Sequence, residues 1–231
     1  IIAVGNGTAS RESEKLVSEV VNEYKDKKVE YIIVSEAGAS VYSASPLAIS
    51  EFPNLHVEER SAISIGRRLQ DPLNELVKID QKSIGVGQYQ HDLPQKALSE
   101  RLDEAIMKCV NRTGADLNTA SQELLTHISG LNSGIAKEIV NYRNENGRFT
   151  NRSQLLKVKK LGPKAYTQCA GFLRIQDGDE PLDQTSIHPE SYEAARSLMH
   201  ACGITKLGQA DIAFPEEKVK DLGIDAYTLK D

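Results

Sequence analysis

The sequence lacks the features that mark membrane and secreted proteins. No apolar run approaches the ~18 residues that a membrane-spanning helix requires, and no charged segment followed by an apolar one opens the chain as a signal peptide does. The three cysteines, Cys109, Cys169 and Cys202, are odd in number and far apart. They fit neither a disulfide framework nor a C-x-x-C metal pair. We therefore expect a cytoplasmic protein with reduced, buried thiols.

An initiating methionine is missing as well. The chain opens on the apolar run IIAV at residues 1–4, which predicts a strand followed by the tight turn GNGT at residues 5–8. We expect the chain to start inside a sheet, as a segment of a longer protein. Its first strands would then expose an unpaired edge.

Asp and Glu outnumber Lys and Arg by 33 to 28, and the resulting net charge of −5 argues against a nucleic-acid partner until it is divided along the chain. Residues 111–174 carry ten Lys and Arg against four Asp and Glu, a balance of +6. The flanking segments are acidic, at −4 for residues 1–110 and −7 for residues 175–231. A basic module inside an acidic chain is the footprint of a polyanion-binding site, although a solvated lysine face gives the same pattern.

The basic segment contains one short pattern twice. The first copy places the turn GLNSG at residues 130–134 between two segments with helical apolar spacing, and the second places KLGPK at residues 160–164 in the same way. Each turn keeps a central leucine, Leu131 or Leu161, that would fill the space between its two helices. This is the outline of a helix-hairpin-helix motif, and two copies predict one compact four-helix unit.

Such a turn offers backbone chemistry. The first amides of the helix that leaves it lack intrahelical partners, and with the helix dipole they form an anion site suited to a phosphate. Glycine there permits close approach and positive φ. The first turn has Gly130 and Asn132, a residue tolerant of the left-handed region, whereas the second has Lys160 where glycine is expected and retains Gly162. The alternative is a plain helical corner without a ligand.

The residues expected to contact nucleic-acid phosphates are those of the two turns and the lysines beside them. They are Gly130, Leu131, Asn132, Ser133, Gly134, Lys137, Lys159, Lys160, Leu161, Gly162, Pro163 and Lys164.

The first part of the chain alternates between strand and helix patterns. Strands are predicted at residues 1–4 and 29–34, a helix between them that Thr8 or Ser10 could cap, and helices at 45–51 and 61–77. This order indicates a parallel α/β sheet with ligands beyond the carboxyl ends of its strands, where Glu36 is the chemical candidate. The rest of the chain is predicted to be helical, with a helix over residues 94–111, then the two hairpins, then helices after residue 188. The predicted fold class is therefore α/β followed by mainly α.

Four segments spread along the chain resemble the Tex family of bacterial transcription accessory proteins. They are GNGTASRE at residues 5–12, SEAGASVYSAS at 35–45, VGQYQHD at 86–92 and DLNTAS at 116–121. In that family a YqgF-type, ribonuclease-H-like domain precedes a helix-hairpin-helix domain and an OB-fold RNA-binding domain. The resemblance implies a partial ribonuclease-H-like domain at 1–84, a connector helix with tandem hairpins at 85–176, and an acidic helical segment at 177–231 that leads to an OB-fold domain absent from this chain.

Ribonuclease-H-like sheets are associated with phosphodiester cleavage by two Mg²⁺ ions, held by acids on the first strand, a later strand end and a late helix. Glu36 matches the strand-end acid, but the late-helix position falls near Arg60 and Ser61, and the first-strand acid would precede Ile1. One carboxylate does not hold a two-metal site. We therefore expect no catalytic residue, no metal ligand and no cofactor.

Three functions from different classes remain open. The favoured one is a transcription accessory protein that binds RNA or DNA backbones without reading sequence, with the transcription machinery as a further partner and no contact with a membrane. The second is a metal-dependent nuclease that uses Glu36. The third is a platform for protein interaction, which the basic segment disfavours as the sole function.

Overall fold

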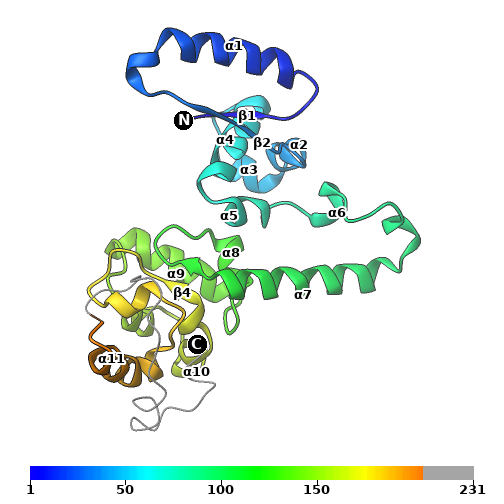
Figure 1. The fold of residues 1–231 in the computed structure, drawn as a ribbon. Coiled ribbons are helices and arrows are strands. Elements are labelled where there is room, and N and C mark those ends of the chain that lie inside the picture. The colour runs from blue at the N-terminus through cyan, green and yellow to red at the C-terminus, as the bar shows by residue number, and fades with distance from the viewer. Residues whose placement is uncertain (205–231) are drawn as a thin grey trace. The chain divides into compact units, whose positions relative to one another are not determined.

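The computed structural model describes residues 1–204, so the helical tail expected after residue 215 lies outside the described residues. The chain forms two compact units, Ile1–Ala105 and a second that begins at Ile106 (Figure 1). Among the described residues, none of the helices combines the length and apolarity of a membrane span.

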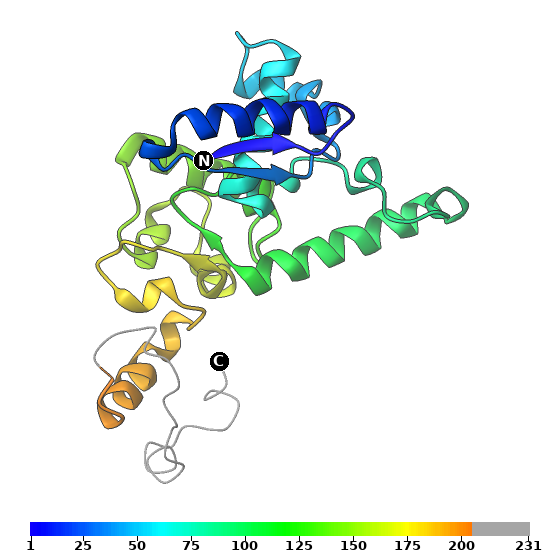
Figure 2. The same cartoon turned by 45° about the horizontal axis from the view of Figure 1, so that its top comes forward.

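The first unit begins with a strand-helix-strand motif. It consists of β1 (Ile2–Gly5), α1 (Ser10–Glu23), a short 3₁₀ turn η1 (Lys25–Lys27) and β2 (Tyr31–Val34). The two strands pair in parallel, and α1 lies alongside them (Figure 2). Parallel strands need such a crossover because the chain must return to the same end of the sheet. The predicted α/β start is confirmed, but the N-cap of α1 is Ala9 rather than Thr8 or Ser10.

Four helices follow the second strand. They are α2 (Ala39–Ser43), α3 (Pro46–Glu51), α4 (Val57–Gln70) and α5 (Pro72–Leu76). The single helix predicted over residues 61–77 is wrong, because Pro72 cannot continue α4 and instead opens α5. The side chain of Asp71 caps α5 by accepting a hydrogen bond from the amide of Asn74 at 3.0 Å.

The core of this unit is small and partly ionic. Tyr42, Ala48 and Ile79 form its buried apolar cluster. Beside it, the Nζ atom of Lys78 lies 2.9 Å from Glu51 and 3.1 Å from the buried Glu75. Within the described residues the sheet of this unit consists of β1 and β2.

A connector and a long helix join the two units. The connector contains α6 (Gln81–Ile84) and η2 (Gln90–Asp92), and the helix is α7 (Gln95–Thr113). The expectation that all three thiols are buried is wrong for Cys109 on this helix, which is exposed. Cys169 is buried and Cys202 is half-buried.

The second unit is built around the repeated pattern. Its first hairpin consists of α8 (Gln122–Thr126) and α9 (Ser133–Asn146), and its second of η3 (Arg152–Lys157) and α10 (Pro163–Cys169). The first segment of the second hairpin is thus a 3₁₀ helix, which is wound more tightly than the expected α-helix, with three residues per turn. α9 ends at Gly147, whose φ of 84° lies in the left-handed region that glycine adopts readily.

The two hairpins enclose one apolar core. A short parallel pair, β3 (Ala115–Asp116) with β4 (Leu173–Arg174), joins the chain just before the first hairpin to the chain just after the second. The core of the two hairpins contains the fully buried side chains of Leu125, Ile139 and Leu155. The remaining elements are η4 (Ala170–Phe172), η5 (Pro181–Gln184), η6 (Pro189–Ser191) and α11 (Tyr192–Ala201). The fold class predicted from the sequence is confirmed.

Candidate nucleic-acid interface

The first turn places a glycine in the left-handed region and a capping side chain after it. Gly130 has a φ of 84°, and the amide of Leu131 donates to the carbonyl of Ile128 at 3.0 Å. Asn132 is extended, with φ −130° and ψ 172°, and its Oδ1 atom accepts from the amide of Ile135 at 3.0 Å. The interpretation of Asn132 as a substitute for a left-handed glycine is therefore wrong: it is the N-cap of α9.

The second turn repeats this backbone geometry with different residues. Lys160 has a φ of 65°, in the left-handed region that Gly130 also occupies. The amide of Leu161 donates to the carbonyl of Val158 at 3.2 Å, as the amide of Leu131 does in the first turn. Gly162 is the N-cap of α10, and Pro163 takes the first helical position, where no amide is needed. The sequence repeat is therefore also a repeat in three dimensions.

The glycines of the two turns face different surroundings. A Cβ atom at Gly130 would stand 2.6 Å from the Cβ of Gln168 and 3.2 Å from the carbonyl oxygen of Ala165, both in α10. A Cβ atom at Gly162 would meet no heavy atom within 4 Å. The space at Gly130 is thus occupied by the second hairpin, whereas the space at Gly162 is open to solvent and to a ligand.

Two backbone amides remain available at the start of each helix that leaves a turn. Within the described part of the chain, the amides of Ser133 and Gly134 have no acceptor, because the Asn132 cap takes up only that of Ile135. At the second turn the amides of Lys164 and Ala165 are in the same situation. Such amides can donate to a phosphate oxygen, and the partial positive charge of the α9 N-terminus adds to the attraction at the first turn.

Exposed lysines surround the turns. Lys137 follows the start of α9, Lys159 and Lys160 belong to the second turn, and Lys164 lies in the first turn of α10. The Nζ atom of Lys160 lies 3.0 Å from Oε1 of Glu138, and within residues 1–204 this is the one ion pair that these four lysines make. The hydrogen bond from Lys160 holds the pKa of Glu138 below its usual range, with further contributions from Lys159 and Lys137.

Not all of the positive charge on this segment reaches the surface. Arg152 is 1% exposed, and Arg143 donates to the carbonyls of Leu117 and Ala120 at 3.1 Å. Arg174 donates to the carbonyl of Gly171. Because these three guanidinium groups bond to the protein's own backbone, the balance of +6 overstates the charge available to a polyanion.

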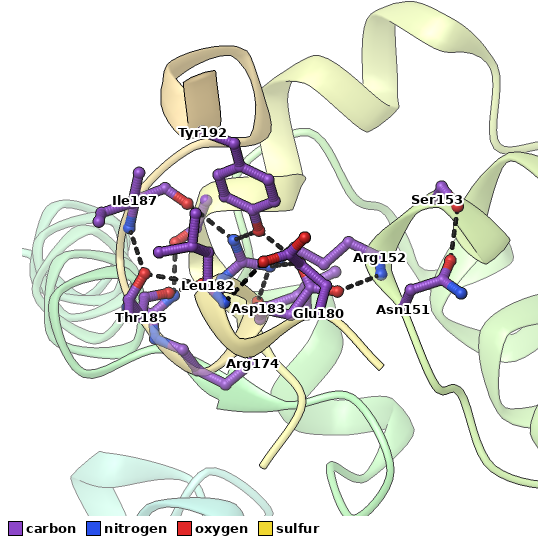
Figure 3. Close-up of polar contacts among 12 residues, drawn as sticks. Asn151, Arg152, Ser153, Arg174, Glu180, Leu182, Asp183, Thr185, Ile187 and Tyr192 are labelled. Carbon is purple, nitrogen blue, oxygen red and sulfur yellow. Dashed lines mark hydrogen bonds and ion pairs between the residues drawn. The ribbon is translucent and has the colours of Figure 1, made fainter. Parts of the chain in front are cut away.

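Arg152 anchors the second hairpin to the segment that follows it (Figure 3). Its amide donates to Asp183 at 2.7 Å, and its guanidinium donates to the carbonyls of Leu173, Thr185 and Ile187 at 2.6–2.7 Å. It also donates to the hydroxyl of Tyr192 at 2.6 Å, and that hydroxyl donates to Asp183. Sequence reasoning missed this cluster, since an arginine in a basic segment gives no signal that it is buried.

Glu36 lies at the carboxyl ends of β1 and β2, as predicted, but its surroundings do not suit metal ions. Its carboxylate packs against the backbone at Gly5 and Gly7, where any side chain would collide with it. The buried guanidinium of Arg68 donates to the carbonyls of Ser35 and Ala37, on either side of Glu36, at 2.7 and 2.8 Å. Among the described residues no three His, Cys, Asp or Glu side chains form a cluster that could hold a metal. One carboxylate beside a buried cation does not fit a two-metal site.

Three protein families match successive parts of the sequence. Residues 1–70 match the Tex protein YqgF-like domain, residues 110–174 match the helix-hairpin-helix motif, and residues 180–231 match the HHH domain. The second match covers both turns described above. The third gives residues 180–231 a domain assignment that the sequence reasoning, which predicted an acidic helical segment there, did not make.

Relatives match almost the whole chain. It is 52% identical to the uncharacterized protein YdcI of Bacillus subtilis, over 100% of this chain and 33% of that protein. It is 53% identical to the transcriptional accessory protein Tex of Neisseria gonorrhoeae, over 99% of this chain and 30% of that protein. The human S1 RNA-binding domain-containing protein 1 is 42% identical over 88% of this chain and 26% of its own length. The chain thus spans about a third or less of the relatives it matches.

Proposed function

Since the chain belongs to the Tex family, and carries that family's YqgF-like domain together with helix-hairpin-helix segments, we propose that it binds nucleic acid through the phosphate backbone without reading base sequence. The observation that carries the proposal is the repeat of one turn geometry, at Gly130 and at Lys160, inside the helix-hairpin-helix match.

The chemistry of each turn suits a phosphate group. The two available amides at each helix start would donate to phosphate oxygens, those of Ser133 and Gly134 in the first hairpin and those of Lys164 and Ala165 in the second. The surrounding lysines would add charge attraction. Contacts of this kind fix the position of a nucleic acid but carry no sequence information, because every nucleotide presents the same phosphate.

We extend the proposal to the setting of this binding. The name of the gonococcal relative, a transcriptional accessory protein, favours a role beside the transcription machinery. The name of the human relative, an S1 RNA-binding domain-containing protein, favours RNA among the ligands. We also propose that the chain is not an enzyme, since the surroundings of Glu36 do not fit the metal site that phosphodiester cleavage would require.

A binding panel tests this function. Fluorescence anisotropy would compare single- and double-stranded RNA and DNA of unrelated sequences, each at several salt concentrations. Four lysines at the turns predict a slope of about −3 to −4 in log K against log salt for a duplex, from about −0.9 per neutralised phosphate. Affinity should change little with sequence. Absence of salt-dependent binding to all four ligands would contradict the proposal.

A further inference from the structure

One acid lies among the lysines of the candidate interface. Glu138 follows Lys137 in α9, and its side chain is 18% exposed, while that of its partner Lys160 is 64% exposed. The partner comes from the other hairpin, so the pair joins α9 to the second turn across 3.0 Å. Lys159 and Lys137 also act on the Glu138 carboxylate. This carboxylate therefore stands where a phosphate would find the same positive charges.

The backbone at Lys160 is unfavourable for any residue with a Cβ atom. A left-handed φ of 65° is normally found at glycine, and the first turn has glycine, Gly130, at the equivalent position. Packing explains the glycine at Gly130, which lies against Gln168. The second turn instead carries a lysine in the strained conformation, and that lysine reaches Glu138. A strained residue that makes a specific contact points to a function for the contact.

We propose that Glu138 competes with the nucleic-acid backbone for Lys160. Its carboxylate pairs with Lys160 in the free protein and releases it when a phosphate binds. This proposal rests on the function proposed above and specifies how that site is regulated. The bound phosphate takes over Lys160, while Glu138 stays nearby and repels it. Glu138 thus lowers the affinity for any single anion and favours polymers that offer several phosphates at once.

The energetics of the pair allow this exchange. An ion pair between a largely exposed lysine and a carboxylate near the surface contributes little to stability, so a phosphate can displace it at small cost. The remaining negative charge reduces the number of phosphates that the site effectively neutralises. Removing this charge should therefore raise the affinity and steepen its dependence on salt.

Glu138→Gln in the 231-residue chain tests the proposal, with binding measured on the same four labelled oligonucleotides. We expect an affinity about two- to five-fold higher at low salt, which corresponds to the strength of an exposed ion pair. The salt slope should steepen by about 0.9 for a duplex or about 0.7 for a single strand. In a Lys160→Gly background, most of this gain should disappear.

Glu145→Gln is the matched control. Glu145 is an exposed acid on the same helix, and its change alters the net charge equally. It lies seven residues further along α9, about 10.5 Å along the helix axis, which is about one Debye length at 0.1 M salt. Its effect on affinity should be clearly smaller. Equal gains in affinity from the two glutamine variants would show that Glu138 acts only through the net charge of the protein, and would overturn the proposal.

A second measurement separates failure of this proposal from failure of the proposed function. NMR titration of the Glu138 carboxyl should show its pKa rising toward the usual range in Lys160→Gly, with no nucleic acid present. If the parent binds and Glu138→Gln binds no more tightly, the competitor role is wrong and the binding function stands. If neither protein binds any of the four ligands, both proposals are wrong.

Discussion

Gly130 in the first turn lies against Gln168 in α10, so closely that a Cβ atom at position 130 would stand 2.6 Å from the Cβ of Gln168. The two hairpins therefore interlock at this point, and the missing side chain of Gly130 serves their packing. Gly162 has an ordinary φ of −86° and open space around it. Two glycines from equivalent turns thus have different roles, one in the fold and one at the exposed start of a helix.

Stability measurements should separate these two glycines. Gly130→Ala forces a side chain into a left-handed backbone and against α10, so we expect the free energy of unfolding to fall by about 1–3 kcal/mol. Gly162→Ala should change it by no more than about 0.5 kcal/mol, as at other exposed positions. Urea denaturation followed by circular dichroism would measure both. Similar losses in the two variants would contradict the interlocked packing.

Gly162, which we expect to matter little for stability, should matter for nucleic-acid binding. Gly162→Val adds a branched side chain beside the amides of Lys164 and Ala165, so it should obstruct a phosphate and weaken binding at every salt concentration. Lys164→Gln removes a charge instead and should flatten the salt slope by about 0.9 for a duplex. Fluorescence anisotropy at three or more salt concentrations distinguishes the two patterns. If the Gly162→Val variant folds and binds like the parent, this turn is a helical corner that does not contact the nucleic acid.

Lys160 combines a backbone cost with a charge, and two substitutions separate them. Lys160→Gly removes both, so we expect the free energy of unfolding to rise by up to about 1 kcal/mol while binding weakens. Lys160→Ala removes the charge and keeps the strained backbone, so binding should weaken equally without the gain in stability. Thermal unfolding and anisotropy on the same samples check both expectations. Equal stability of the two variants would show that the left-handed conformation carries no strain.

The buried arginine is expected to support the fold around the second hairpin. Arg152→Leu removes the donor of three backbone carbonyls and the buried cation that lies 3.7 Å from Oδ1 of Asp183. It should therefore destabilise the second unit by about 3–5 kcal/mol. Arg148→Ala is the control, since its ion pair with Asp177 is exposed on both sides and should contribute less than about 1 kcal/mol. Hydrogen exchange on residues 181–192 would locate the loss. Unchanged protection there in Arg152→Leu would contradict the anchoring role.

Local patterns made the architecture predictable. The alternation of strands and helices before residue 84 and the repeat at thirty-residue spacing both depend on short stretches of sequence, and both are confirmed. Alignment of the two turns showed that Lys160 occupies a position where glycine is expected. The structure shows that Lys160 has the positive φ that glycine would adopt there.

Long-range contacts could not be predicted in the same way. The role of Gly130 depends on Gln168, and the burial of Arg152 depends on Asp183 and Tyr192, all distant in sequence. Asn132 was assigned to the wrong conformation because asparagine suits both a left-handed position and an N-cap. Its hydrogen bond to Ile135 decides between them, and composition alone does not reveal that bond.

The last prediction concerns hydrolysis at Glu36. The carboxylate packs against the backbone at Gly5 and Gly7, and the amide of Glu36 donates to Asn6 at 3.0 Å, so this residue joins the two loops at the carboxyl ends of the strands. With Arg68 as the neighbouring buried cation, we expect labelled RNA and DNA to remain intact when Mg²⁺ or Mn²⁺ is added. Gel electrophoresis of the labelled strands is the measurement.

Glu36→Gln provides the control for trace activity. The amide has the same shape as the carboxylate, so the variant should fold, and any cleavage by a contaminating nuclease should persist in it unchanged. Cleavage that requires metal in the parent and disappears in Glu36→Gln would instead assign a catalytic role to this carboxylate. It would also show that two loops arranged around Glu36, with a single acid, suffice to recruit a metal ion.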